Sequence, residues 1–220
     1  MWWNNSVMLL ENIYGSILII VREVASEEKD LVSEIVEIHL ATFTGFFLTF
    51  MGRGFLNQMY RSYCDHNDSG LLVAEDNGQA VGFLAYSSDF SGLYKYMLKT
   101  RLVPFAWYSL GAFIRKPSSF MHILSAFLKP GEAKRTERYV ELSSIGVNPK
   151  IKSKGVGSLL IDDLKNRVDF SKFAYINLET DAVNNEGPIH FYEKNGFVKQ
   201  RSFETDEGRK MYEYRFFGDK

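Results

Sequence analysis

The chain has 220 residues and a formal net charge of −1, and 45% of its residues are hydrophobic, 15% aromatic and 24% charged. A chain of this length can bury a core that folds without disulfides, and the single cysteine, Cys64, excludes a disulfide framework and a cysteine-rich zinc site. The near-neutral charge argues against a protein that coats nucleic acid, because such proteins carry a basic excess. We therefore expect one domain over residues 1–220, with no nucleic-acid partner and no metal.

The beginning of the chain shows neither a membrane span nor a secretory signal. The apolar stretch 7–21 is interrupted by Glu11, Asn12 and Gly15, so it is too broken for a span of about 20 apolar residues. No positive residue precedes this stretch and no small-residue cleavage site follows it, which favours a cytoplasmic protein. Residues 1–15 fit no predicted element.

The first clear elements are a strand and a helix. Residues 16–23 are rich in β-branched side chains, which predicts a strand. Ser26 is placed to cap a helix over residues 27–41, which has acidic residues in its first turn and apolar residues at helical spacing.

A second helical region spans residues 46–64, and we expect Gly52 and Gly54 to bend it. One apolar stripe along it is expected to face the core, as is Cys64; the stripe consists of Phe55, Leu56, Met59, Tyr60 and Tyr63. Two apolar runs then flank Asn77-Gly78, and this dipeptide at the turn predicts a β-hairpin.

Residues 90–131 differ from their surroundings because they contain no Asp or Glu. They are rich in aromatic side chains, and Pro104, Pro117 and Pro130 are expected to divide them into short helices. A helical apolar stripe is formed by Phe120, Ile123, Leu124, Phe127 and Leu128. The basic residues are Lys95, Lys99, Arg101, Arg115, Lys116 and Lys129. The segment therefore carries six positive charges, and the rest of the chain carries −7.

The remaining pattern alternates strands and helices. The predicted elements are a strand at 138–147, a helix at 157–168, a strand at 174–180, a helix from 186 to 195, and a strand pair within 198–216. This order indicates an α/β or α+β domain with a mixed sheet.

The loop between the strand at 138–147 and the next helix has the features of a phosphate-binding site. Gly155 and Gly157 allow close backbone approach, the helix start presents free N–H groups, and Lys150, Lys152 and Lys154 add positive charge. The loop lacks the Walker A pattern, and the alternative interpretation is a solvated turn with lysines.

The segment from Val147 to Leu160 resembles the acyl-CoA-binding motif of the GNAT superfamily of N-acetyltransferases, which reads Val-x-Pro and then Arg/Gln-x-x-Gly-x-Gly/Ala. Lys152 stands at the Arg/Gln position. Residues 185–197 resemble the family's second motif, an Asn-x-x-Ala-x-x-x-Tyr-Glu-Lys-x-Gly-Phe helix, with Gly187-Pro188 in place of its small-residue pair. The resemblance implies a mixed, mostly antiparallel sheet flanked by helices, with residues 90–131 as a helical insertion.

The resemblance also implies acetyl-CoA as the co-substrate. The strand ending at Val147 would pair with the pantetheine arm, and the loop and helix start would bind the pyrophosphate. The implied contacts are Ile145, Val147, Lys152, Ser153, Lys154, Gly155, Val156, Gly157, Ser158, Asn185 and Tyr192.

Two residues are the main catalytic candidates. Tyr192 matches the family tyrosine that can protonate the thiolate, and its alternative is packing beside Phe191 and Phe197. Glu141 lies on the strand where some family members carry a catalytic Glu, and its alternative is an exposed carboxylate or a salt bridge. The rival candidates are Glu179, Asp181, His190 and His39.

Residues 90–131 are interpreted as a cover over the acceptor site. Because they are basic, we expect an anionic acceptor, such as an amino sugar or a nucleotide-linked amino sugar, held by Arg101, Arg115 and Lys116. Tyr94, Trp107 and Tyr108 would supply stacking surface. The alternatives are contact with an anionic membrane surface, and packing on the domain or in a homodimer.

We therefore predict an acetyl-CoA-dependent N-acetyltransferase that modifies a primary amine of a small molecule by direct attack on the thioester. The alternatives are acetylation of a protein N-terminus or lysine, and a non-catalytic acyl-CoA-binding module.

Overall fold

The computed structural model describes residues 6–12, 15–115, 137–151, 155–206 and 208–218, and eight strands within these ranges form one sheet. The sheet order is β1-β2-β3-β4-β5-β6-β8-β7. The strands are β1 (Ser6–Asn12), β2 (Gly15–Glu23), β3 (Ser69–Asp76), β4 (Gln79–Ser87), β5 (Val140–Val147), β6 (Ile176–Asp181), β7 (Val198–Glu204) and β8 (Lys210–Phe216). Neighbouring strands are antiparallel except β5 and β6, which confirms the expected mixed sheet.

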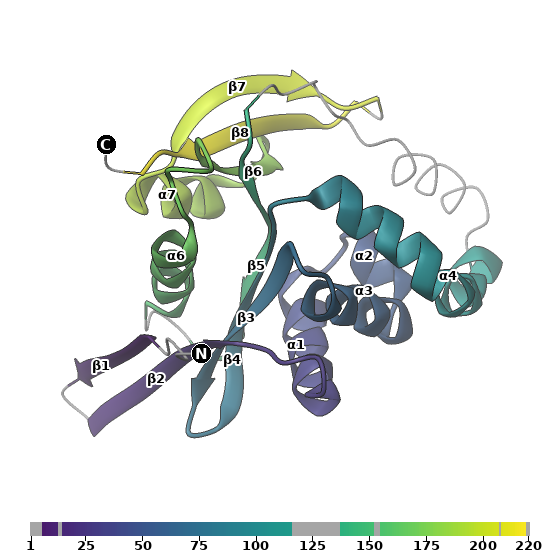
Figure 1. Ribbon diagram of the computed structural model, residues 1–220, viewed down its shortest axis with the longest axis horizontal. Coiled ribbons are helices and arrows are strands. Elements are labelled where there is room, and N and C mark those ends of the chain that lie inside the picture. The colour runs from purple at the N-terminus through teal and green to yellow at the C-terminus, as the bar shows by residue number, and fades with distance from the viewer. Residues whose placement is uncertain (1–5, 13–14, 116–136, 152–154, 207, 219–220) are drawn as a thin grey trace.

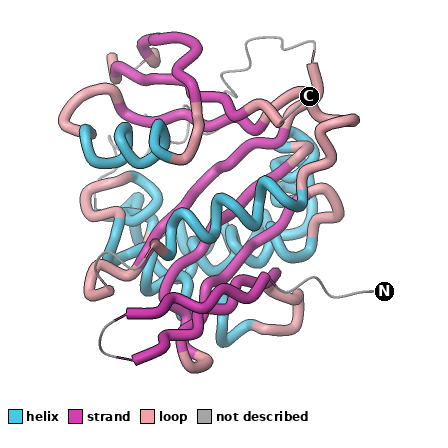
Figure 2. The backbone as a smooth tube through the Cα atoms, turned by 90° about the vertical axis from the view of Figure 1, so that its left-hand side faces the viewer, coloured by secondary structure: helices cyan, strands magenta, loops and turns pink. Residues whose placement is uncertain are grey.

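Helices cover both faces of this sheet (Figure 1). The helices are α1 (Lys29–Thr42), α2 (Phe47–Met51), α3 (Arg53–Asp65), α4 (Phe90–Arg115), α6 (Val156–Arg167) and α7 (Glu186–Lys194). The first four lie on one face, and α6 lies across the strands on the other, as Figure 2 shows. Alternate residues of β4 enter the two cores: Phe83 packs with α1 and α3, and Leu84 packs with α6. Each such burial contributes about 1.5–3 kcal/mol.

The hairpin predicted at Asn77-Gly78 is confirmed. Asn77 has a φ of +50° and Gly78 a φ of +78°, the left-handed conformations that a two-residue hairpin turn requires. Residues 6–12, which fit no element by sequence, form the edge strand β1 through pairing with β2. Their strand character depends on this partner, because the local sequence does not alternate polar and apolar residues.

The expected cap of α1 is wrong. The helix begins at Lys29 with Glu28 at its N-cap, and the Ser26 hydroxyl donates instead to the Cys64 carbonyl at 3.0 Å. Glu28 is held by a bidentate hydrogen-bonded ion pair with Arg22 of β2, with both distances 2.8 Å. This charge-assisted contact ties the turn to the sheet, so the helix starts two residues later than predicted.

Glycines determine how the next helices pack. Gly52, with a φ of +88°, separates α2 from α3, as predicted. Gly54 does not bend the chain, because it lies within α3; a Cβ there would be 2.1 Å from the Tyr108 ring of α4. Gly54 therefore allows α3 and α4 to approach each other closely.

Two helical stretches meet at a kink within α4, in keeping with the division expected at Pro104. In α4, Arg101 has a φ of −130°, three residues before Pro104, whose ring is incompatible with a straight helix. Pro117, Pro130 and the apolar stripe at 120–128 lie outside the described residues.

Candidate active site

The sheet opens between β5 and β6. These parallel strands pair at two positions, Val140 with Ile176 and Glu141 with Asn177. Beyond Glu141, the edge of β5 that faces β6 has no strand partner in the described part of the chain. An extended ligand can hydrogen-bond to such an edge as an added strand does.

A β-bulge lies beside this opening. Tyr86 of β4 is opposite Leu142 of β5, and Ala85 is opposite Ser144, so Ser143 is the extra residue. Leu142 packs into the core under α6. Ser143 and Ser144 both line a pocket on the other side of the sheet. The bulge therefore places two consecutive hydroxyl side chains on the same face.

Glu141 stands where β5 and β6 separate. Its Oε2 accepts a hydrogen bond from Asn177 Nδ2 of β6 at 2.9 Å. Burial, reinforced by the nearby Glu141 carboxylate, raises the pKa of Tyr63 on α3 to about 12. The half-buried carboxylate thus lies on the α3 side of the sheet, two residues before the bulge, where it could accept a proton from an amine.

The start of α6 has the geometry of an anion site. Gly155 has a φ of +71° and is the N-cap of the helix. The first intrahelical bond runs from the Leu159 N–H to the Gly155 carbonyl, so the N–H groups of Val156, Gly157 and Ser158 point out of the helix end. Such an N-terminus favours a phosphate. The predicted contacts Lys152, Ser153 and Lys154 lie outside the described residues.

The two sequence motifs meet in space. A Cβ at Gly157 would lie 3.0 Å from the Phe191 ring, so this glycine lets α7 pack against the start of α6. Asn185, the N-cap of α7, donates from Nδ2 to Thr180 Oγ1 at 2.7 Å and to the Asp181 carbonyl at 2.9 Å. Because the side-chain amide nitrogen of Asn185 holds the β6–α7 turn, a contact with pantetheine would use the side-chain oxygen, Oδ1.

Tyr192 packs among aromatic rings. Its ring centroid lies 5.4 Å from that of Phe191 and 6.0 Å from that of Phe197. Burial raises the pKa of Tyr192 to about 12, so the phenol keeps its proton at neutral pH, as a general acid must. The side chains of Ile145 and Val147, the predicted pantetheine strand, pack against the core under α6.

The acidic rivals of Glu141 are engaged in ion pairs on β6. Asp181 forms a bidentate pair with Arg209, with distances of 2.8 and 2.9 Å, and Glu179 lies 3.9 Å from Arg201. His190 on α7 is exposed. These contacts anchor β6 to β7 and β8.

The remaining candidates are held within the core under α3. His39 Nδ1 lies 2.7 Å from the Tyr60 hydroxyl, and burial lowers the pKa of His39 to about 4. Cys64 is half-buried, and burial raises the pKa of its thiol to about 12, which disfavours the nucleophilic thiolate.

The structure places Arg101 away from the expected role in acceptor binding. Its guanidinium donates to Gln58 Oε1 at 2.7 Å and forms an ion pair with Asp65, and its side chain is only 12% exposed. Arg101 therefore ties α4 to α3. The side chain of Arg115 and the whole of Lys116 lie outside what the structure describes.

The outward side of α4 is apolar. It exposes Val103 at 78%, Trp107 at 72% and Ile114 at 72%. No helix in the described ranges is both long enough and apolar enough to cross a membrane.

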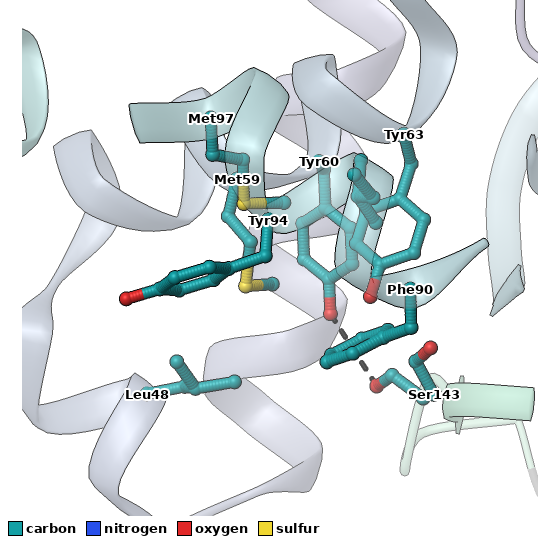
Figure 3. A pocket seen from close by; sticks show the side chains of 10 residues that line it. Leu48, Met59, Tyr60, Tyr63, Phe90, Tyr94, Met97 and Ser143 are labelled. Atoms are coloured by element: carbon teal, nitrogen blue, oxygen red, sulfur yellow. Dashed lines mark hydrogen bonds between the residues drawn. The ribbon is translucent and has the colours of Figure 1, made fainter. Parts of the chain in front are cut away.

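A pocket formed by α2, α3, α4 and β5 was not expected from the sequence (Figure 3). It holds about 120 Å³. Its lining residues are Leu48, Met59, Tyr60, Tyr63, Phe90, Leu93, Tyr94, Met97, Ser143 and Ser144. Helical spacing alone predicts that Tyr60 and Tyr63 face the core. A signal was nevertheless present, because tyrosines in an apolar stripe carry hydroxyls that need polar partners.

One group of potential metal ligands occurs among the described residues. His66, Asp68 and Asp89 bring ligand atoms within 4.8 Å of one another at the surface. Two of these side chains have structural partners: His66 Nδ1 lies 2.9 Å from Ser69 Oγ, and Asp89 accepts the Gly92 N–H at 2.8 Å.

Comparison with known proteins identifies the class. The family model described as acetyltransferase (GNAT) family matches residues 33–197. No curated protein sequence matches this chain at a significant level. The fold is similar to that of a GNAT-family acetyltransferase from Bacillus cereus, with a TM-score of 0.56, 15% identity, and coverage of 92% of this chain and 99% of the other.

Two further solved structures show the same fold. An N-acetyltransferase from Staphylococcus aureus has a TM-score of 0.54 and 16% identity, covering 90% of this chain and 98% of the other. The ribosomal-protein-S18-alanine N-acetyltransferase from Escherichia coli has a TM-score of 0.54 and 14% identity, covering 90% of this chain and 93% of the other. The chain belongs to the acetyltransferase (GNAT) family.

Proposed function

We propose that the protein transfers an acetyl group from acetyl-CoA to a primary amine of a small molecule. The observation that carries this proposal is the junction of β5 and β6, where the unpaired strand edge, the Ser143 bulge and Glu141 adjoin one another. The anion site at Gly155 lies on the helix that follows β5 and would bind the pyrophosphate.

The reaction needs no covalent enzyme intermediate. The amine nitrogen attacks the thioester carbon, the carbon–sulfur bond breaks, and the amine gives up one proton. In our proposal Glu141 accepts that proton, directly or through a water, and the Tyr192 phenol donates a proton to the departing thiolate. The buried, protonated state of Tyr192 supports its role.

Two alternatives remain in competition with this proposal. Acetylation of a protein N-terminus or lysine would need space for a peptide beside α4; the E. coli protein is named for acetylation of an alanine of ribosomal protein S18. A non-catalytic acyl-CoA-binding module would bind acetyl-CoA without releasing thiol. Contact of α4 with a membrane surface, or with a second copy, is a separate proposal supported by its exposed side chains, Trp107 among them.

Calorimetry with acetyl-CoA, followed by thiol release on a panel of amines and peptides, tests the function. We expect binding, and turnover with small amines that exceeds turnover with peptides. Gly155→Glu places a negative charge at the start of α6 and should weaken acetyl-CoA binding at least about tenfold. Gly208→Glu is the matched control, because Gly208 also has a positive φ, +80°, but lies in the β7–β8 turn. Binding without turnover on every amine would contradict the proposal.

A further inference from the structure

The pocket beside β5 has two chemically different ends. The Tyr60 hydroxyl donates to Ser144 Oγ at 3.4 Å, the dashed line in Figure 3, and the Tyr63 hydroxyl points the same way, toward Ser143, so the β5 end is polar. Leu48, Met59 and Met97 form the other end, and the two methionine sulfurs lie among the rings. A molecule that fills the pocket would therefore direct a polar group to β5 and an apolar group toward α2 and α4.

None of the described residues that line this pocket is charged. Arg101 of α4 is not among them, and its guanidinium is held by Asp65 and Gln58. A phosphate or carboxylate placed against this lining would lose its hydration without a compensating cation, which is strongly unfavourable. Methionine sulfur and aromatic side chains instead favour contact with an aromatic ring.

The size of the pocket suits one ring. Its volume is about 120 Å³, and an apolar protein cavity of about 150 Å³ is known to take up benzene. Phe90, which is 43% exposed, lines the pocket from the start of α4 and lies beside Ser143 in Figure 3.

We propose that the acceptor is a primary amine carrying an uncharged aromatic ring, with the ring beside Met59 and Met97 and the amine at the β5 end, where Phe90 flanks the spacer between them. This inference rests on the proposed function, because it assigns the pocket to the acceptor. It places the amine beside Ser143, two residues from Glu141 on the same strand. It differs from the anionic acceptor that the basic composition of residues 90–131 suggests.

Two amines with the same two-carbon spacer provide the test. 2-Phenylethylamine carries an uncharged ring, and O-phosphoethanolamine carries a phosphate. Their equilibrium binding to the full chain is measured by NMR titration in the presence of CoA, so that no transfer is needed. We expect 2-phenylethylamine to bind at least about tenfold more tightly than O-phosphoethanolamine, because the uncharged lining offers no cation to a phosphate. A tenfold difference corresponds to about 1.4 kcal/mol of binding free energy.

Phe90→Ala tests whether the amine occupies this pocket. It should weaken binding of 2-phenylethylamine about five- to tenfold. The matched control is Phe113→Ala, because Phe113 is on the same helix and 39% exposed, but it lies 23 residues after Phe90, beyond the kink at Arg101. The control should leave binding unchanged within about twofold. Circular dichroism checks that both variants are folded.

The outcomes separate this inference from the proposed function. Equal or tighter binding of O-phosphoethanolamine, or unchanged binding in folded Phe90→Ala, would overturn the aromatic-acceptor proposal while leaving acetyl transfer intact. Ring-selective binding without thiol release from acetyl-CoA on the amine panel would support the pocket assignment and contradict the enzymatic proposal.

Discussion

Asn177 of β6 donates a hydrogen bond to Glu141 of β5 at 2.9 Å, at the last position where the two strands pair. The contact joins the two halves of the sheet at the point where they begin to diverge. It also restricts the carboxylate to one orientation beside the bulge. Glu141 is therefore our candidate for the general base, and we expect Asn177 to position its carboxylate.

Replacing the carboxylate tests this role. Glu141→Gln keeps an oxygen that can accept from Asn177 but cannot take a proton, so we expect kcat to fall about 10²-fold or more, with acetyl-CoA binding unchanged. Steady-state thiol release and calorimetry measure the two quantities. Glu179→Gln is the control, since Glu179 is an exposed carboxylate on β6 and should retain activity. A Glu141→Gln enzyme with wild-type kcat would remove Glu141 from the mechanism.

Removing the Tyr192 hydroxyl tests the general acid. Because burial raises its pKa to about 12, Tyr192 stays protonated throughout the usual assay range, and activity should not decline between pH 7 and 10 through this group. We expect Tyr192→Phe to lower kcat about 10²-fold with little loss of stability. Tyr214→Phe is the control and should keep its kcat. It also removes one tyrosine hydroxyl, but that hydroxyl donates to Glu193 at 2.9 Å and has no role in the proposed proton transfer. If both variants keep full kcat, Tyr192 is only a packing residue.

The ion pair of Arg101 and Asp65 predicts a structural effect. Arg101→Met should lower the free energy of unfolding by about 2 kcal/mol, because it leaves a largely buried carboxylate without its partner. Urea unfolding measures this change. Arg53→Met removes an exposed pair with Glu37 and should have little effect. An Arg101→Met protein with unchanged stability and a raised KM for anionic amines would instead support the acceptor role expected from the sequence.

His39 should make stability depend on pH. Burial lowers its pKa from 6.5 to about 4, so between these values the unfolded chain binds a proton that the folded chain does not. Its contribution is present above pH 6.5 and is lost as the pH falls toward 4, with about 2 kcal/mol lost between pH 7 and 5. His39→Gln should abolish this part of the dependence. Urea unfolding of both proteins at the two pH values measures the difference, and equal slopes would show that His39 is not responsible.

Local patterns were sufficient for much of the fold. The Asn77-Gly78 turn, the glycine start of α6 and the motif helix α7 follow from residues close together in sequence, whose backbone preferences need few distant partners. The failures come from contacts that these local patterns do not contain. Ser26 is a good cap by type, but the Arg22–Glu28 ion pair decides where α1 begins.

The sequence by itself determined the family, and it identified the loop before α6, Glu141 and Tyr192 as candidates for the site. Only the tertiary structure decided what these residues face. Glu141 meets Asn177, and Arg101 meets Asp65, each across 36 positions of the chain. The neutral pocket likewise combines side chains from three helices and one strand. Periodicity reports which face of an element is apolar, but it does not report which elements meet, so the chemistry of the acceptor site depends on packing.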